Sequence, residues 1–154
     1  MMFEDLRDLY QEIILQHGRK PSHGLRLEVF DADAKGNNPM CGDRVQVFVR
    51  HDADTVAEVG FEARGCAISV ASADLMAETM QGRGRADTRA LFEAFRTLAR
   101  TGACPDCGSA LAEPLERLAP LAGVHEYPSR VKCATLPWHA LIAALDGTKE
   151  ASSE

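Results

Sequence analysis

A short turn in the first third of the chain places a thiol and a carboxylate two positions apart. Cys41 and Asp43 flank Gly42, whose backbone freedom lets both side chains point at one atom. The preceding Asn38-Pro39 pair favours a turn, because the residue before a proline is disfavoured in the helical region. Thiolate and carboxylate are both anionic, so two of them on one turn indicate a cation between them. The sequence therefore predicts a metal-binding turn.

Four further cysteines bear on this chemistry. Cys66 and Cys133 are the candidates for additional ligands. Cys66 directly precedes an apolar segment predicted to be helical, and a helix N-terminus favours a thiolate. Cys104 and Cys107 are spaced like one half of a zinc ribbon, but the second half is missing. Their role is open between a redox dithiol, a sulfur relay toward Cys41, half of an intersubunit metal site, and a turn without chemistry.

Composition and charge limit the compartment and the partners. The chain has 154 residues, 45% hydrophobic and 26% charged, as expected for one soluble globular domain. A net charge of −6 without a basic run argues against nucleic-acid binding. Because neither a secretion signal nor a bilayer-spanning apolar run is visible, we expect a cytoplasmic protein with no membrane partner. Five cysteines there favour metal or redox chemistry over structural disulfides.

Alternating apolar residues predict three strands in the first half of the chain. These strands are expected at 25–29, 45–49 and 57–61, with 31–36 as a polar turn. Consecutive strands joined by short connections favour an antiparallel meander. We therefore expect a three-stranded antiparallel sheet.

Helical periodicity, a change to apolar composition after Cys66, and stop signals predict the remaining elements. Helices are expected at 3–17, 67–80, 87–100, 113–118 and 136–145. The last helix would have Pro137 in its first turn, where proline is tolerated. Strands followed by helices indicate an α+β fold with the helices packed on one face of the sheet. Residues 1–146 are expected to form a single domain, and 147–154 a disordered tail.

Three cysteine motifs together resemble the U-type iron–sulfur assembly family, and specifically its SufU branch. They are NNPMCGD, FEARGCAISVASADLM and YPSRVKCATLPWHAL, preceded by the similar opening LRDLYQEIILQHGRKP. The resemblance extends from Leu6 to Leu141 and implies a SufU/IscU-like fold. Within it, the segment from about 82 to 125 resembles the insertion of the SufU branch.

The resemblance also implies a site and a partnership. The family's metal ligands fall on four positions of this chain: Cys41, Asp43, Cys66 and Cys133. Where the IscU branch has a histidine ligand, this chain has Lys132, which cannot bind as a neutral imidazole. The implied cofactor is tightly bound Zn²⁺, and the implied partner is a SufS-type cysteine desulfurase whose persulfide sulfur the protein accepts for downstream iron–sulfur assembly proteins. The alternative is a scaffold that assembles a transient 2Fe–2S cluster on the same ligands and passes it to apo-proteins.

The residues of such a site would have different roles. Three thiolates and a carboxylate suit tetrahedral Zn²⁺, and the thiolate is the form of cysteine that attacks sulfur. We expect Cys41 to carry the persulfide, because its Pro/Gly turn can move while helices hold the other two cysteines. Arg130 and Lys132 flank Cys133 and either offset the negative charge of the site or are simply solvated basic residues.

Two other classes of protein fit the residues less well. A stand-alone cysteine enzyme needs a Cys–His pairing or an oxyanion motif, and neither is visible. A structural zinc adaptor without sulfur chemistry is usually built from Cys and His alone, so Asp43 argues against it. We therefore expect a sulfurtransferase-like partner of a cysteine desulfurase rather than a stand-alone enzyme.

Overall fold

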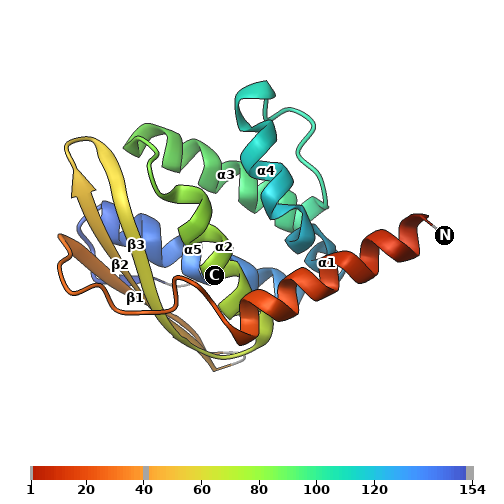
Figure 1. Cartoon of the computed structure of the whole chain (residues 1–154), viewed down its shortest axis with the longest axis horizontal. Helices are drawn as coiled ribbons and strands as arrows, with labels where there is room; N and C mark the ends of the chain where they lie inside the picture. The colour runs from red at the N-terminus through yellow and green to blue at the C-terminus, as the bar shows by residue number, and fades with distance from the viewer. Residues whose placement is uncertain (1, 40–41, 152–154) are drawn as a thin grey trace.

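The computed structural model of this protein describes residues 2–39 and 42–151. Figure 1 shows a sheet covered on one face by α2 and α5, with the other helices packed around them. No helix within these ranges is long and apolar enough to cross a membrane. The elements in chain order are α1 (Met2–Arg19), β1 (Ala32–Asn38), β2 (Asp43–Asp52), β3 (Thr55–Arg64), α2 (Ala67–Met80), α3 (Arg85–Thr101), η1 (Ser109–Leu111), α4 (Ala112–Leu118), η2 (Ala119–Glu126), α5 (Pro128–Leu145) and β4 (Glu150–Ala151).

The sheet is mixed and has four strands in the order β3-β2-β1-β4. The antiparallel pairing of β1, β2 and β3 confirms the predicted meander, but β4 adds a parallel strand beside β1. The prediction of a three-stranded antiparallel sheet is therefore corrected. β4 lies in the segment 147–154, for which the sequence predicts no ordered structure. The neighbouring Lys149 forms an ion pair with Asp33 of β1 at 2.9 Å. Tertiary contacts of this kind hold β4 in place, and a strand of two residues is too short to show a period in the sequence.

The first strand lies in the segment that was predicted to be a polar turn, and the predicted strand at 25–29 is irregular. The inward positions of β1 are small: Ala34 is fully buried, and a Cβ on Gly36 would lie 3.1 Å from Leu136 of α5. Close packing of α5 thus requires small residues, which carry little strand signal. By contrast, Leu25 and Val29 are 52% and 71% exposed, so their alternation does not mark a buried strand face.

A buried polar link joins α2 to α5 within the apolar core. Trp138 is fully buried and stacks on Phe95 of α3, with ring centroids 4.2 Å apart. Its indole Nε1–H donates to Ser72 Oγ at 3.0 Å, and the Ser72 hydroxyl donates to the carbonyl of Ala134. Since a buried N–H without a partner is costly, this bond specifies how the two helices face each other.

The last helix is longer than predicted and contains its proline internally. It begins at Pro128 rather than at 136, so Pro137 lies within α5 and not in its first turn. Proline has no N–H to donate to the carbonyl four residues earlier, which here belongs to Cys133. The Ser69 hydroxyl of α2 lies 3.1 Å from that carbonyl oxygen and shares its one proton between it and the carboxylate of Asp43. The neighbouring helix therefore allows α5 to continue through the proline.

The N-terminal helix is attached to α2 through one buried carboxylate. Asp74 is 1% exposed; its Oδ2 lies 2.5 Å from His17 Nδ1, and its Oδ1 accepts the backbone N–H of His23 at 2.8 Å. A buried carboxylate requires partners of this kind. These bonds fix the end of α1 and the following turn against α2, the helix that Cys66 directly precedes.

The Trp138–Ser72 bond leads to a stability prediction. Ser72→Ala leaves the indole N–H unpaired in the core, so we expect the free energy of unfolding to fall by about 1–3 kcal/mol. The measurement is urea unfolding followed by circular dichroism, with Ser129→Ala at an exposed position as the control. In a Trp138→Phe background, which has no N–H, the same change should cost clearly less. Equal losses in both backgrounds would contradict the assigned role of the bond.

Candidate metal centre

Three of the four predicted ligands meet at one end of the sheet. Asp43 begins β2, Cys66 directly precedes α2, and Cys133 lies in the second turn of α5. One ligand atom from each lies within 4.8 Å of the other two. In the part of the chain that the structure describes, these three residues form the group of His, Cys, Asp or Glu side chains that lies close enough together to hold a metal ion. The fourth predicted ligand, Cys41, lies outside the described residues.

Strand register directs the Asp43 side chain inward. Asp43 pairs with Asn38 across the turn between β1 and β2, and Gly42, with φ of 75°, donates its N–H to the Asn38 carbonyl at 2.9 Å. Alternate residues of β2 from Asp43 to Val49 are buried, so the first of them also faces the interior. Asp43 is only 2% exposed. The turn thus delivers a carboxylate into the interior at the sheet end.

The start of α2 holds both carboxylate oxygens. The Cys66 backbone N–H donates to Asp43 Oδ1 at 3.0 Å, and the Ser69 hydroxyl donates to Oδ2 at 2.6 Å. The Cys66 thiol lies 3.5 Å from the same Oδ2. The free N–H groups and the dipole of a helix N-terminus also favour this negative charge. These contacts offset the cost of burying a carboxylate and aim it at the thiols.

Gly65 makes this approach possible. A Cβ added to Gly65 would lie 2.7 Å from the Asp43 carboxyl carbon, well inside van der Waals contact. Its φ of 154° is also unusual for a residue with a side chain. The chain can therefore bring Cys66 against Asp43 only with glycine between β3 and α2.

Arg130 extends its guanidinium toward the two thiols, although the residue is exposed. The charge of Cys66 and then that of Cys133 raise the pKa of Arg130 above its ordinary value, with hydrogen bonding to both thiols contributing. Arg130 can thus offset negative charge at the cluster. Lys132 is half-buried, and the described contacts give its side chain no hydrogen bond or ion pair to the cluster.

The donor set fits a thiophilic metal ion. Tetrahedral Zn²⁺ with Zn–S bonds of about 2.3 Å separates its sulfur ligands by roughly 3.8 Å. Ligand atoms within 4.8 Å of one another need only a small closing movement to reach that geometry. Two thiols and a carboxylate from Asp43, Cys66 and Cys133 supply three ligands, and Cys41 is the predicted fourth. Soft thiolates favour zinc or an iron–sulfur cluster over magnesium or calcium.

Sequence reasoning missed one residue of the site and proposed others that lie elsewhere. Ser69 was not singled out, although its position three residues after Cys66 places it on the same helical face. Cys104 and Cys107 are bonded to each other and are not part of the metal-binding group. The exposed His125 has its Nδ1 2.8 Å from the Ala122 carbonyl and is not part of the metal-binding group either.

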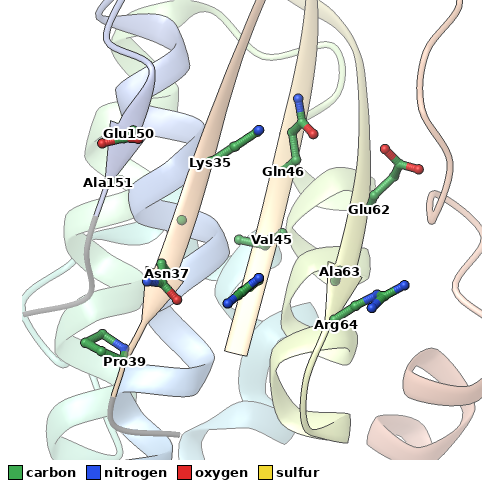
Figure 2. Close-up of a pocket in the computed structure, with 12 residues that line it drawn as sticks. Lys35, Asn37, Pro39, Val45, Gln46, Glu62, Ala63, Arg64, Glu150 and Ala151 are labelled. Carbon is green, nitrogen blue, oxygen red and sulfur yellow. The ribbon is translucent and has the colours of Figure 1, made fainter. Parts of the chain in front are cut away.

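Two hollows flank this end of the molecule. One, of about 650 Å³, lies on the outer face of the sheet, where Lys35, Gln46, Glu62 and Arg64 project (Figure 2). It does not include the three clustered ligands. The second, of about 720 Å³, is lined by α1, η2 and the starts of α2 and α5, including Arg130. The second hollow therefore lies near the thiols, on the side of the molecule that the helices form.

The family model for the NifU-like N-terminal domain matches residues 9–134. The chain belongs to this NifU-like family. It is 32% identical over 145 residues to the iron–sulfur cluster assembly scaffold protein IscU of Streptococcus pyogenes serotype M1, covering 94% of this chain and 87% of the relative. It is 33% identical over 138 residues to the zinc-dependent sulfurtransferase SufU of Bacillus subtilis strain 168, covering 89% of each.

A solved structure shares the fold. The crystal structure of a proposed scaffold protein of the SUF system, from Fervidobacterium islandicum AW-1, superposes with a TM-score of 0.75 at 30% identity. The match covers 87% of this chain and 94% of the other. The resemblance to the U-type iron–sulfur assembly family is therefore confirmed, and with it the α+β architecture of the IscU and SufU proteins.

The contact at Gly65 predicts a selective loss of metal binding. Gly65→Ala pushes the Asp43 carboxylate away from Cys66, so we expect zinc affinity to fall by roughly 10- to 100-fold. Gly123→Ala is the matched control, because a Cβ there meets no atom within 4 Å. Competition with a chromophoric zinc chelator measures the affinity. Equal zinc affinities for both variants would show that the Asp43 position does not matter for binding.

The double role of Ser69 can be separated by a second substitution. Ser69→Ala removes the hydroxyl near Asp43 and near the Cys133 carbonyl, so we expect lower zinc affinity and lower stability. Adding Pro137→Ala supplies an N–H for that carbonyl and should restore stability without restoring affinity. Urea unfolding and chelator competition measure the two quantities. If both recovered together, the direct bond to Asp43 would have no role in binding.

Proposed function

We propose that this NifU-like family member is a zinc-containing sulfur acceptor that takes persulfide sulfur from a SufS-type cysteine desulfurase for iron–sulfur cluster assembly. The observation that carries the proposal is the buried carboxylate of Asp43 placed between the thiols of Cys66 and Cys133. The name of the B. subtilis relative, a zinc-dependent sulfurtransferase, supports the same activity.

The proposed zinc ligands are Cys41, Asp43, Cys66 and Cys133. When bound, Zn²⁺ would keep the cysteines deprotonated at neutral pH. A mixed set of three thiolates and one carboxylate includes a harder oxygen ligand among softer sulfurs. Such a site suits exchange of one ligand better than an all-thiolate structural site does.

Cys41 is the proposed acceptor of sulfur. Its thiolate attacks the outer sulfur of the desulfurase persulfide, a new S–S bond forms on Cys41, and the bond to the donor cysteine breaks. The donor leaves as a thiolate, so the transfer involves no net oxidation or reduction. Cys66 and Cys133 stay on their helices. Arg130, whose guanidinium faces both thiols, attracts the anionic persulfide toward the cluster.

The second candidate function is a scaffold for a transient 2Fe–2S cluster on the same ligands. The IscU names of relatives from S. pyogenes and Thermotoga maritima favour it. Cysteine thiolates are also the usual ligands of such clusters. The two candidates differ in which metal the purified protein holds and in whether a cluster is passed on.

The sulfur-acceptor proposal is tested through metal content and desulfurase turnover, measured together for wild type, Cys41→Ala and the exposed control Ser109→Ala. We expect about one zinc per wild-type chain and faster cysteine turnover when the protein is added. Cys41→Ala should abolish that acceleration, while Ser109→Ala should keep it.

Other outcomes separate the alternatives. Zinc binding without any acceleration would reject sulfur transfer in favour of a structural role. Iron in place of zinc, with a visible chromophore that moves to an apo-ferredoxin after anaerobic reconstitution, would establish the scaffold. Radiolabelled sulfur accepted by Cys41→Ser at the wild-type rate would reject Cys41 as the carrier.

A further inference from the structure

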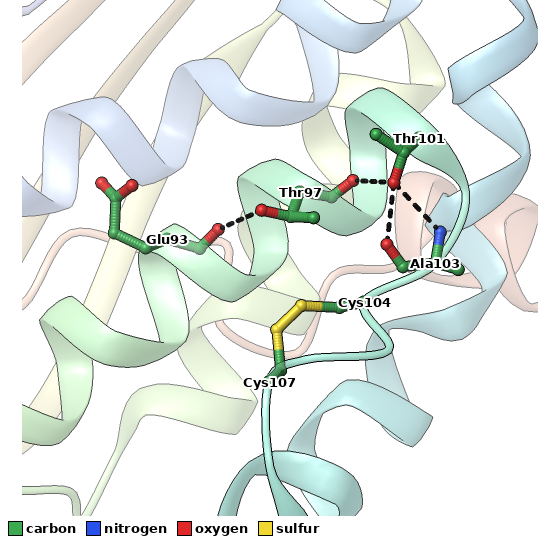
Figure 3. Close-up of a disulfide and its surroundings, with 6 residues drawn as sticks. All are labelled: Glu93, Thr97, Thr101, Ala103, Cys104 and Cys107. Carbon is green, nitrogen blue, oxygen red and sulfur yellow. Dashed lines mark hydrogen bonds between the residues drawn. A yellow bond between two sulfur atoms is a disulfide. The ribbon is translucent and has the colours of Figure 1, made fainter.

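One cysteine pair has no part in the metal centre. Cys104 and Cys107 lie in the connection between α3 and η1, and their sulfurs are bonded to each other (Figure 3). Their Cα atoms are 5.5 Å apart, within the usual range for a disulfide. Both residues are only half-buried, so reagents and protein thiols can reach them.

The backbone holds the two cysteines close together independently of the sulfur–sulfur bond. The Cys107 N–H lies 3.4 Å from the Cys104 carbonyl, which closes the turn between them. Gly102, with φ of 87°, ends α3, and the Thr101 hydroxyl lies 2.8 Å from the Ala103 carbonyl at the start of the connection (Figure 3). A turn anchored in this way keeps the thiols adjacent after the bond is reduced.

A metal-binding role is not supported by the neighbouring side chains. Zinc requires four ligands, and the pair supplies two. Within the part of the chain that the structure describes, no His, Asp, Glu or further Cys joins Cys104 and Cys107 in a group that could hold an ion. The Cys-x-x-Cys spacing is also that of thiol–disulfide redox pairs.

The connection that holds the pair begins at a hollow that Arg130 also lines. The hollow of about 720 Å³ is lined by Gly102, two residues before Cys104, and by Arg130, which faces the thiols of the cluster. In Figure 1 the segment between α3 and α4 nevertheless lies apart from the start of α2. Chemistry between the two places therefore requires a carrier or a second chain rather than direct contact.

We propose that Cys104 and Cys107 form a redox-active dithiol that reduces the sulfane sulfur of a persulfide to sulfide. This inference rests on the proposed function, because it gives a use to the sulfur that a persulfide acceptor collects. Iron–sulfur clusters contain sulfide, whereas the outer sulfur of a persulfide is more oxidised by two electrons. A dithiol on the same protein, reached by a small persulfide carrier or by a second chain, supplies those two electrons.

The proposed reaction balances in two exchange steps. First, one thiolate of the pair attacks the outer sulfur of R–S–SH, which forms a persulfide on that cysteine and releases R–S⁻. Second, the other thiolate attacks the inner sulfur, so that the Cys104–Cys107 bond forms and HS⁻ leaves. In sum, R–SSH and the dithiol give R–SH, the disulfide and H₂S. A dithiol reductant then regenerates the pair and is itself oxidised to a disulfide.

The test uses full-length zinc-loaded protein that has been reduced with dithiothreitol, freed of reductant without oxygen, and mixed with cysteine persulfide. Wild type should release about one sulfide per chain above the protein-free blank, and its 104–107 peptide should lose two hydrogens. The Cys104→Ser/Cys107→Ser variant should release roughly tenfold less. The matched control Ser109→Ala, at the first residue of η1 directly after this connection, should behave as wild type.

Single variants report on the intermediate. With only one of the two thiols replaced by serine, the remaining cysteine should retain one added sulfur atom, detected by mass spectrometry of the intact peptide. Cys41→Ser should keep sulfide release from cysteine persulfide while losing the acceleration of the desulfurase. Failure of the proposed sulfur-acceptor function and failure of the redox pair are thus separate results.

Two results would overturn the inference. The first is sulfide release by the double variant equal to that of wild type. The second is a second zinc ion per chain in reduced wild type that the double variant lacks, because the pair would then be a metal site. Zinc content near one per chain in both proteins supports the redox assignment.

Discussion

The buried carboxylate of Asp43 is the constraint around which this molecule is arranged. A carboxylate that is 2% exposed must find donors or a cation, and the structure provides the backbone N–H of Cys66 and the hydroxyl of Ser69. Both donors come from the N-terminal end of α2. The sheet end, the Gly65 junction and the helix must therefore keep fixed positions relative to one another, and this places Cys66 beside the carboxylate.

The same requirement extends into α5. Pro137 leaves the carbonyl of Cys133 without its intrahelical donor, and Ser69 lies 3.1 Å from it. One hydroxyl thus contacts both the carboxylate ligand and the backbone of the last cysteine ligand. Three residues further along α2, the Ser72 hydroxyl accepts the Trp138 indole N–H and donates to the Ala134 carbonyl, so it also joins α2 to α5. The interface between α2 and α5 is apolar overall but is specified by two serines.

The cysteines that the structure describes lie in two different settings, and each setting suits a different kind of sulfur chemistry. At the candidate metal centre, Cys66 and Cys133 face a carboxylate and a guanidinium, a polar setting that suits charged thiolates and an anionic persulfide. Cys104 and Cys107 face each other on an anchored connection, a setting that suits two-electron exchange. The comparisons with known proteins assign the chain to the NifU-like family, and its relatives include an iron–sulfur cluster assembly scaffold protein and a zinc-dependent sulfurtransferase.

The sequence alone determined the family and most of the elements. The motifs around Cys41, Cys66 and Cys133 indicated the family, and apolar periodicity together with local composition located β2, β3 and four of the five α-helices to within a few residues. Such signals are local, because one buried face imposes a repeat of 2 or 3.6 residues. A four-residue motif such as Cys104 to Cys107 is local too, but its meaning depends on what surrounds it.

Only the tertiary structure decided the remaining features. β1 was hidden because α5 packs so closely on it that Gly36 is needed, and β4 is too short to show a period. The start of α5 was misplaced because Pro137 is tolerated only when another helix satisfies the freed carbonyl. The role of Ser69 likewise depends on contacts between three segments of the chain, because its hydroxyl meets both Asp43 and Cys133. These features depend on contacts between residues that are far apart in the sequence, so no single stretch of sequence can reveal them.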